Sequence, residues 1–156
     1  MFTADHPRLG ALEFEHDGGG YWSCRMSLAG AEDVEVEIEC ALRKTEVAVV
    51  DVIRRAISEL DELEVAARAS LVALEGTEPD ATTVYIGTHL PAEEAVRPST
   101  SSFVEKLEIV KVHVVDEPEE GLHLQFDYSI DPGSTNYLLV VWMNPDGAVS
   151  MVGLES

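Results

Sequence analysis

The chain has 156 residues, with 30 Asp and Glu against 10 Lys and Arg, and its formal net charge is −20. This length suits one domain with a substantial core and excludes two domains of ordinary size. Apolar residues make up 46% of the chain, which excludes an acidic disordered tail as a description of the whole. The shortage of Lys and Arg also argues against direct binding to nucleic acid or to an anionic membrane, because such binding requires cations that neutralise phosphates.

The sequence carries no pattern for export or membrane insertion. Residues 1–7 contain no basic segment followed by an apolar one, so no secretory signal is predicted. The longest apolar runs, at 47–50 and 137–143, are far shorter than the roughly 20 residues that span a bilayer. Two cysteines, Cys24 and Cys40, are too few for a disulfide scaffold or for a zinc site of their own. We therefore predict a cytoplasmic protein.

The first forty residues predict three short strands of an antiparallel meander. Apolar and polar residues alternate over 11–15, 22–28 and 34–40. Alternation with a period of two is typical of strands that have one buried face. Segments at 17–20 and 29–33 separate the strands, and both contain glycine and suit turns.

One face of this meander is predicted to be apolar. The residues expected there are Leu12, Phe14, Trp22, Cys24, Met26, Leu28, Val34, Val36, Ile38 and Cys40. If Leu28 pairs with Val34 in the second hairpin, Trp22 faces Cys40. This register is a prediction that the structure can test directly.

From residue 45 to residue 75 the period changes to that of a helix. Apolar residues recur at intervals of three or four, at Val47, Val50, Ile53, Ile57, Leu60, Leu63, Ala67, Leu71 and Leu74. Gly76 and Pro79 end the pattern. One helix over this segment would measure about 45 Å, longer than a small sheet needs. Ser58 or Asp61 could cap a second helix, which leaves a continuous helix and a helix kinked between these residues as the two alternatives.

The remaining residues predict a short helix, a linker and a second meander. Thr82 or Thr83 can cap a helix that ends at Leu90, and residues 97–102 are typical of a linker. Four strands separated by turns then follow, at 107–115, 122–130, 136–143 and 148–154. We therefore predict a single domain over residues 1–156 of the α+β class. It would contain an antiparallel three-stranded meander, a long helix plus a short helix, and an antiparallel four-stranded meander.

The end of the chain resembles a known bacterial family. The pattern consists of F-D-Y-S-I at 126–130, T-N-Y-L-L-V-V at 135–141, D-G at 146–147 and the terminal E-S at 155–156. These residues are similar to the ending of a family of small acidic proteins described only as a domain of unknown function. The resemblance implies a bacterial cytosolic protein with an acidic meander, a long and a short helix, and further strands. It implies no activity and no catalytic residues.

One face of the first meander is predicted to concentrate negative charge. Opposite the apolar stripe lie Glu13, Glu15, Arg25, Glu35, Glu37 and Glu39. Neighbouring carboxylates on one strand stand about 6.6 Å apart, and like charges this close destabilise a sheet unless a cation shares them. The surface either docks a basic partner, with its charge accelerating the encounter, or is an ordinary solvated strand face.

The sequence contains no local motif for catalysis or for a cofactor. The five histidines, His6, His16, His89, His113 and His123, lack metal-ligand spacing. His113 and His123 flank the turn at 117–121 and could be cross-strand neighbours. Beside Asp116 or Glu108 such a pair could bind a transition metal, although a solvent-facing pair is the simpler interpretation. No nucleophile elbow or phosphate-binding loop is present, so we predict no catalytic residues, no metal site and no cofactor.

These observations favour a non-enzymatic interaction module that binds a basic protein through its acidic surface. An immunity protein paired with a toxin is one concrete version. One alternative is a small metal-dependent hydrolase whose site is assembled from scattered His and acidic residues. Another is a homo-oligomeric structural protein, for example a homodimer, because the strand at 137–143 is apolar on both faces and each face needs a cover.

Overall fold

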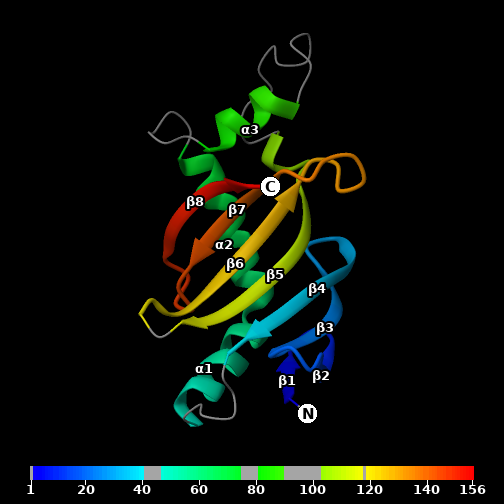
Figure 1. The fold of residues 1–156 in the computed structure, drawn as a ribbon, viewed down its shortest axis with the longest axis vertical. Helices are drawn as coiled ribbons and strands as arrows, with labels where there is room; N and C mark the ends of the chain where they lie inside the picture. The colour runs from blue at the N-terminus through cyan, green and yellow to red at the C-terminus, as the bar shows by residue number, and fades with distance from the viewer. Residues whose placement is uncertain (1, 41–46, 75–80, 90–102, 118) are drawn as a thin grey trace.

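The protein is an eight-stranded sheet with helices packed on it (Figure 1). The computed structural model describes residues 2–40, 47–74, 81–89, 103–117 and 119–156. The strands before the helices are β1 (Phe2–His6), β2 (Gly10–His16), β3 (Tyr21–Leu28) and β4 (Ala31–Glu39). The helices are α1 (Val47–Ser58), α2 (Leu60–Ala73) and α3 (Ala81–His89). The strands after them are β5 (Glu108–Glu117), β6 (Gly121–Ser129), β7 (Leu138–Met143) and β8 (Val149–Glu155).

All the strands belong to one sheet whose spatial order equals the chain order, β1 to β8. Neighbouring strands are antiparallel except β4 and β5, which run parallel from Glu35 beside Lys111 to Glu39 beside Val115. The α+β class fits broadly, but the predicted division into a three-stranded and a four-stranded meander is wrong. The helices between β4 and β5 form a long crossover, which is the connection that a parallel pair requires.

The sheet begins with a strand that the sequence pattern did not predict. The five residues of β1 alternate between buried and exposed, and β1 pairs antiparallel with β2. The Nε atom of Arg54 on α1 donates a hydrogen bond to the carbonyl oxygen of Thr3 (3.2 Å). Its pairing with β2 is what defines this strand.

The register between β3 and β4 differs by two residues from the prediction. Met26, and not Leu28, lies opposite Val34. Ala29 and Gly30 form a two-residue turn with φ values of 51° and 83°, and positive φ at both positions is typical of a tight type I′ hairpin turn. The loop is therefore shorter than predicted. A shift of two residues returns each side chain to the same face, so the apolar stripe still faces the core.

The core lies between the sheet and the helices. Most of the predicted stripe is buried, at Phe14, Met26, Leu28, Val34, Val36, Ile38 and Cys40, whereas Leu12, Trp22 and Cys24 are half-buried against the same core. All three helices contribute buried residues to this cluster, among them Ile53, Ile57, Leu60, Leu71 and Tyr85. Burying one such aliphatic side chain stabilises the fold by about 2 kcal/mol. In Figure 1, α2 runs behind the sheet, and the face toward the viewer carries none of the labelled helices.

The long predicted helix is broken at Glu59, between the end of α1 and the start of α2. The hydroxyl of Ser58 donates to the carbonyl oxygen of Arg55 (2.7 Å). Such local side-chain hydrogen bonds compete with the backbone ladder and favour bends. The kinked alternative is therefore confirmed, with the break inside the predicted range.

Helix α3 begins at Ala81, just before the predicted caps Thr82 and Thr83, and is fixed to the sheet by one buried tyrosine. The hydroxyl of Tyr85 donates to the carbonyl oxygen of Tyr137 (3.2 Å) and accepts from the backbone N–H of Ile130 (3.1 Å). Leu90, the predicted end of this helix, and the predicted linker at 97–102 lie outside the described residues.

Arg68 of α2 ties the residues before β5 to the core. Its guanidinium contacts a carboxylate oxygen of Glu64 at 2.8 Å and donates to the carbonyl oxygens of Val104 (2.7 Å) and Leu107 (3.0 Å). Glu64 is only 3% exposed, and the ring of Tyr128 lies under the guanidinium, 5.1 Å from Cζ. Burial, followed by the charge of Glu64, raises the pKa of Tyr128. Without Arg68, a carboxylate would stay buried and unpaired, which is strongly destabilising.

We expect Arg68→Met to lower the free energy of unfolding by about 3 kcal/mol, because it leaves Glu64 buried without its cation. Urea denaturation measures this change. Arg55→Met is the matched control, since Arg55 pairs with Glu59 at the same helical spacing but is 72% exposed. The control should lower the free energy of unfolding much less, because an exposed ion pair contributes little. Equal losses in the two variants would contradict the anchoring role of Arg68.

Candidate protein-interaction face

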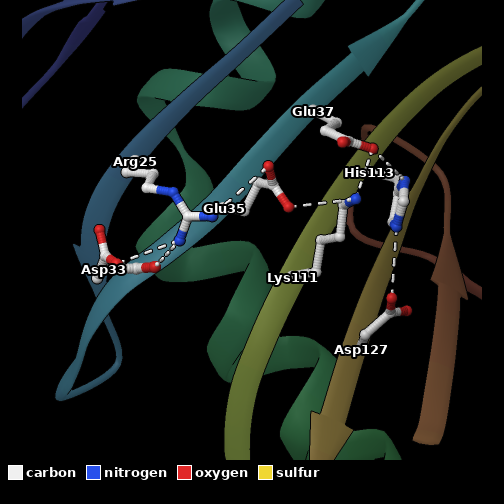
Figure 2. Close-up of polar contacts among 7 residues, drawn as sticks. All are labelled: Arg25, Asp33, Glu35, Glu37, Lys111, His113 and Asp127. Carbon is white, nitrogen blue, oxygen red and sulfur yellow. Dashed lines mark hydrogen bonds and ion pairs between the residues drawn. The ribbon is translucent and has the colours of Figure 1, made fainter. Parts of the chain in front are cut away.

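The predicted acidic residues lie on the sheet face opposite α2, which we call the acidic face and define by Glu13, Glu15, Arg25, Glu35, Glu37 and Glu39. Figure 2 shows Arg25, Glu35 and Glu37 in front of the sheet, with α2 behind it. Pairing places Arg25 opposite Glu35. Glu13, Glu15 and Glu39 are exposed, whereas Glu35 and Glu37 are half-buried. The sequence pattern therefore located this face, but its residues differ in their surroundings.

Part of the acidic face surrounds an open depression between β2 and β3. Its lining includes Glu13, Glu15, Arg25 and Glu35. The described pairing of β2 with β3 covers only Glu15 with Ser23 and His16 with Trp22, so the two strands diverge beyond it. The depression is also lined by Cys24, and burial raises the pKa of this thiol to about 11. The thiol is therefore protonated at neutral pH, which disfavours nucleophilic chemistry there.

Arg25 holds two acidic residues of β4 at the edge of this depression. Its guanidinium donates to the backbone carbonyl oxygen and the carboxylate of Asp33, at 3.1 and 3.2 Å. It also lies 3.8 Å from a carboxylate oxygen of Glu35. More than half of the Arg25 side chain is exposed, so these ion pairs contribute little to stability and leave the guanidinium accessible.

A second cation reaches the acidic face from β5. The Nζ atom of Lys111 lies 2.7 Å from Glu37 and 3.3 Å from Glu35, so one ammonium group bridges both carboxylates (Figure 2). Burial by itself lowers the pKa of Lys111, but the hydrogen bonds and charges of Glu37 and Glu35 outweigh burial, and the pKa lies above its ordinary value. Arg25 is the one cation among the residues predicted for this face, so Lys111 is a cation that the sequence pattern missed.

His113 continues the network from β5 to β6. Its Nδ1 atom lies 3.4 Å from Glu37, and its Nε2 atom lies 3.4 Å from Asp127. Asp127 is almost fully buried and accepts a hydrogen bond from the amide of Gln125 (2.9 Å). A chain of polar contacts therefore crosses the sheet from β3 to β6, as Figure 2 shows from Arg25 to Asp127.

The network divides the acidic residues into two groups. Glu35 and Glu37 are held by Lys111, whereas Glu13, Glu15 and Glu39 form no ion pair with the described residues. No cation among the residues that the structure describes offsets the charge of the latter group. The pKa of Tyr21, which lies opposite Glu39, is raised with the charge of Glu39 as the largest cause. The exposed part of the face is therefore anionic.

Lys111, His113 and Asp127 were not among the predicted residues of this face. Alternation in the predicted strand at 107–115 places Lys111 and His113 on one side, but does not say which strand lies beside them. Parallel pairing places Lys111 beside Glu35 and His113 beside Glu37. These residues are far apart in the sequence, so alternation alone provides no signal for their contact.

The two histidines predicted as possible cross-strand neighbours lie on adjacent strands, but diagonally. His113 lies opposite Gln125, and His123 lies opposite Val115, so the two imidazoles are not directly paired. Over the described ranges of the chain, no group of three or more His, Cys, Asp and Glu residues is placed to hold a metal ion. The described network therefore consists of ion pairs and hydrogen bonds.

Comparisons of the chain with protein-family models, with curated proteins and with solved structures find no significant match. The resemblance to the family of unknown function therefore stays a prediction that these comparisons neither confirm nor refute. In the described residues, no helix is long and apolar enough to cross a membrane. The function must be inferred from the chemistry of the surface.

We expect Lys111→Met to destabilise the fold by about 1 kcal/mol, because Glu35 and Glu37 then repel each other without a shared cation. Lys106→Met is the matched control, since Lys106 is exposed and forms no ion pair with the described residues. Urea denaturation at low salt measures both variants. At about 1 M salt the difference between them should shrink, because screening weakens the repulsion. A difference that does not depend on salt would contradict the electrostatic explanation.

Proposed function

We propose that this is a cytoplasmic bacterial protein that acts as a non-enzymatic interaction module and binds a basic protein through the acidic face. An immunity protein that neutralises a basic toxin is the concrete version of this proposal. The observation that carries it is the group of carboxylates at Glu13, Glu15 and Glu39, which form no ion pair with the described residues and lie on the sheet face that α2 does not cover. A basic surface would find complementary charge there.

The ion pairs within the acidic face support different roles for its paired and its unpaired glutamates. Lys111 fixes Glu35 and Glu37 in place, so their carboxylates contribute to a preorganised strand surface more than to free charge. Preorganised polar groups lose less conformational entropy when a partner binds. Glu13, Glu15 and Glu39 would supply the long-range attraction that accelerates the encounter.

The diverging strands β2 and β3 support a specific contact within this face. The depression between them offers both carboxylates and the accessible guanidinium of Arg25. A lysine or arginine side chain of the partner could contact Glu13 and Glu15 there. Arg25 would repel a partner that places a positive charge next to its guanidinium, and this repulsion gives selectivity.

The test is retention of a basic protein from an extract of the native host at about 50 mM salt. We expect the wild type to retain such a protein, and the triple variant Glu13→Gln, Glu15→Gln, Glu39→Gln to lose it. Calorimetry with the purified partner should then show an affinity at least about tenfold weaker for the triple variant. Glu35 and Glu37 are left unchanged because their substitution would also disturb the network of Lys111.

The control is a second triple variant that removes the same charge elsewhere: Glu62→Gln, Glu119→Gln, Glu120→Gln. These three residues are exposed and lie on α2 and in the turn between β5 and β6. The control should retain the partner as the wild type does. If both triple variants weaken binding equally, net charge alone explains the retention and the acidic face is not the binding site.

A further inference from the structure

The two edges of the sheet differ in how they are protected. β1 forms one edge, and there Arg54 of α1 donates to the carbonyl oxygen of Thr3. β8, drawn in red in Figure 1, forms the other edge and pairs only with β7 among the described strands. In the described residues, no side chain from another element donates to the backbone of β8. Natural sheets usually blunt such an edge.

β8 carries few of the devices that protect an edge: its pairing with β7 has one register shift, between Val149 and Met151, but its sequence adds little to this. In a protein with a net charge of −20, the seven-residue strand V-S-M-V-G-L-E contains one ionisable side chain, Glu155. It contains no proline and no lysine, the residues that most often prevent pairing at an edge. Two of its apolar side chains are exposed, Met151 at 54% and Leu154 at 39%.

The outer surface of β8 has a shape that complements itself. A Cβ atom built on Gly153 would lie 3.1 Å from Cζ3 of Trp142, so the indole ring covers this glycine and leaves no room for a side chain. Met151 stands two residues away on the same face of the strand, opposite Trp142. This face of β8 therefore presents the exposed side chain of Met151 next to Gly153, which has no side chain and is covered by the indole ring of Trp142.

We propose that β8 pairs with β8 of a second copy of this chain, antiparallel about a two-fold axis at Val152. Full overlap of the seven-residue strand requires this register. It places Met151 of each copy beside Gly153 of the other, where the thioether would meet the edge of the Trp142 ring, a favourable sulfur–aromatic contact. The same patch serves both copies, as a two-fold interface demands. The two sheets would then join into one.

The distribution of charge argues for a second copy as the occupant. In this register Glu155 lies opposite Val149, so the two Glu155 side chains stand about 20 Å apart, beyond a Debye length of about 8 Å in physiological salt. The carboxylates of the acidic face lie on β2 and β4, which β5, β6 and β7 separate from β8 in the strand order. At the β8 edge, two strongly acidic copies can therefore meet without placing carboxylates side by side, so that only the longer-range repulsion of their net charges remains.

Sedimentation velocity on the purified chain alone, from about 1 to 200 μM, tests the proposal. We expect a shift from monomer to dimer that strengthens between about 50 and 500 mM salt, because salt screens the repulsion between the acidic copies. Binding of a basic partner should weaken over the same salt range, so failure of this proposal and failure of the proposed function are distinguishable. A monomer at all these concentrations would overturn the pairing.

Met151→Glu should raise the dimer dissociation constant at least about tenfold, because it places two new carboxylates beside the joint. Val65→Glu is the matched control, since Val65 is 65% exposed and lies on α2. The control should leave the dissociation constant within about twofold. Equal effects of the two variants would argue against β8 as the interface.

The register is tested by disulfide formation in a Cys24→Ser background. Val152→Cys should cross-link two copies under mild oxidation, because residue 152 faces its own copy. Ser150→Cys should not cross-link, because the two copies of residue 150 would be separated by about four strand residues, or about 14 Å. Cross-linking at equal rates, or at neither position, would reject the register.

Discussion

The parallel pair of β4 and β5 is the contact on which the rest of the structure depends. It joins two groups of strands that are separated in the chain by all three helices. On the inner face, Val36 and Ile38 continue the apolar core into Val112 and Val114. On the outer face, the ammonium group of Lys111 bridges Glu35 and Glu37 and offsets part of their charge. One pair of strands therefore completes the core and makes a dense row of carboxylates tolerable.

This pairing also explains how a highly acidic chain accommodates closely spaced carboxylates on β4. Carboxylates at alternate positions of β4 would repel one another if the neighbouring strand offered no cation. Lys111 and His113 come from β5, and Asp127 from β6, so the network spans strands that the sequence separates widely. Glu13, Glu15 and Glu39 lie outside this network. Their exposed carboxylates are the part of the acidic face that we propose binds a basic partner.

The acidic face and the β8 edge occupy different parts of the sheet. The first involves β2, β3 and β4, and the second lies at the far end of the strand order. A copy bound at β8 would leave Glu13, Glu15 and Glu39 open to solvent. The two proposals are therefore compatible, and a dimer would present two acidic faces to its partners. Their opposite expected salt dependence follows from their chemistry, because one attracts opposite charge and the other must overcome like charge.

Sequence patterns determined the local features of this protein. Alternation located β2, β3 and β4 and their buried faces but not β1, and the helical period located α1 and α2, with the break between Ser58 and Asp61 left as an alternative. These features depend on neighbours within a few residues, so the chain itself records them. The predicted register of β3 and β4 failed because the turn at Ala29 and Gly30 is tighter than its composition suggested.

Only the tertiary structure decided which strands lie side by side and which charges meet. Alternation gives each strand two faces but carries no information about its neighbours, so the parallel pairing of β4 with β5 was not predicted. For the same reason, the sequence identified Glu35 and Glu37 as candidate site residues but not Lys111, the cation that holds them. The net charge of −20 belongs to the sequence, whereas the fold decides which carboxylates a cation bridges and which stay exposed.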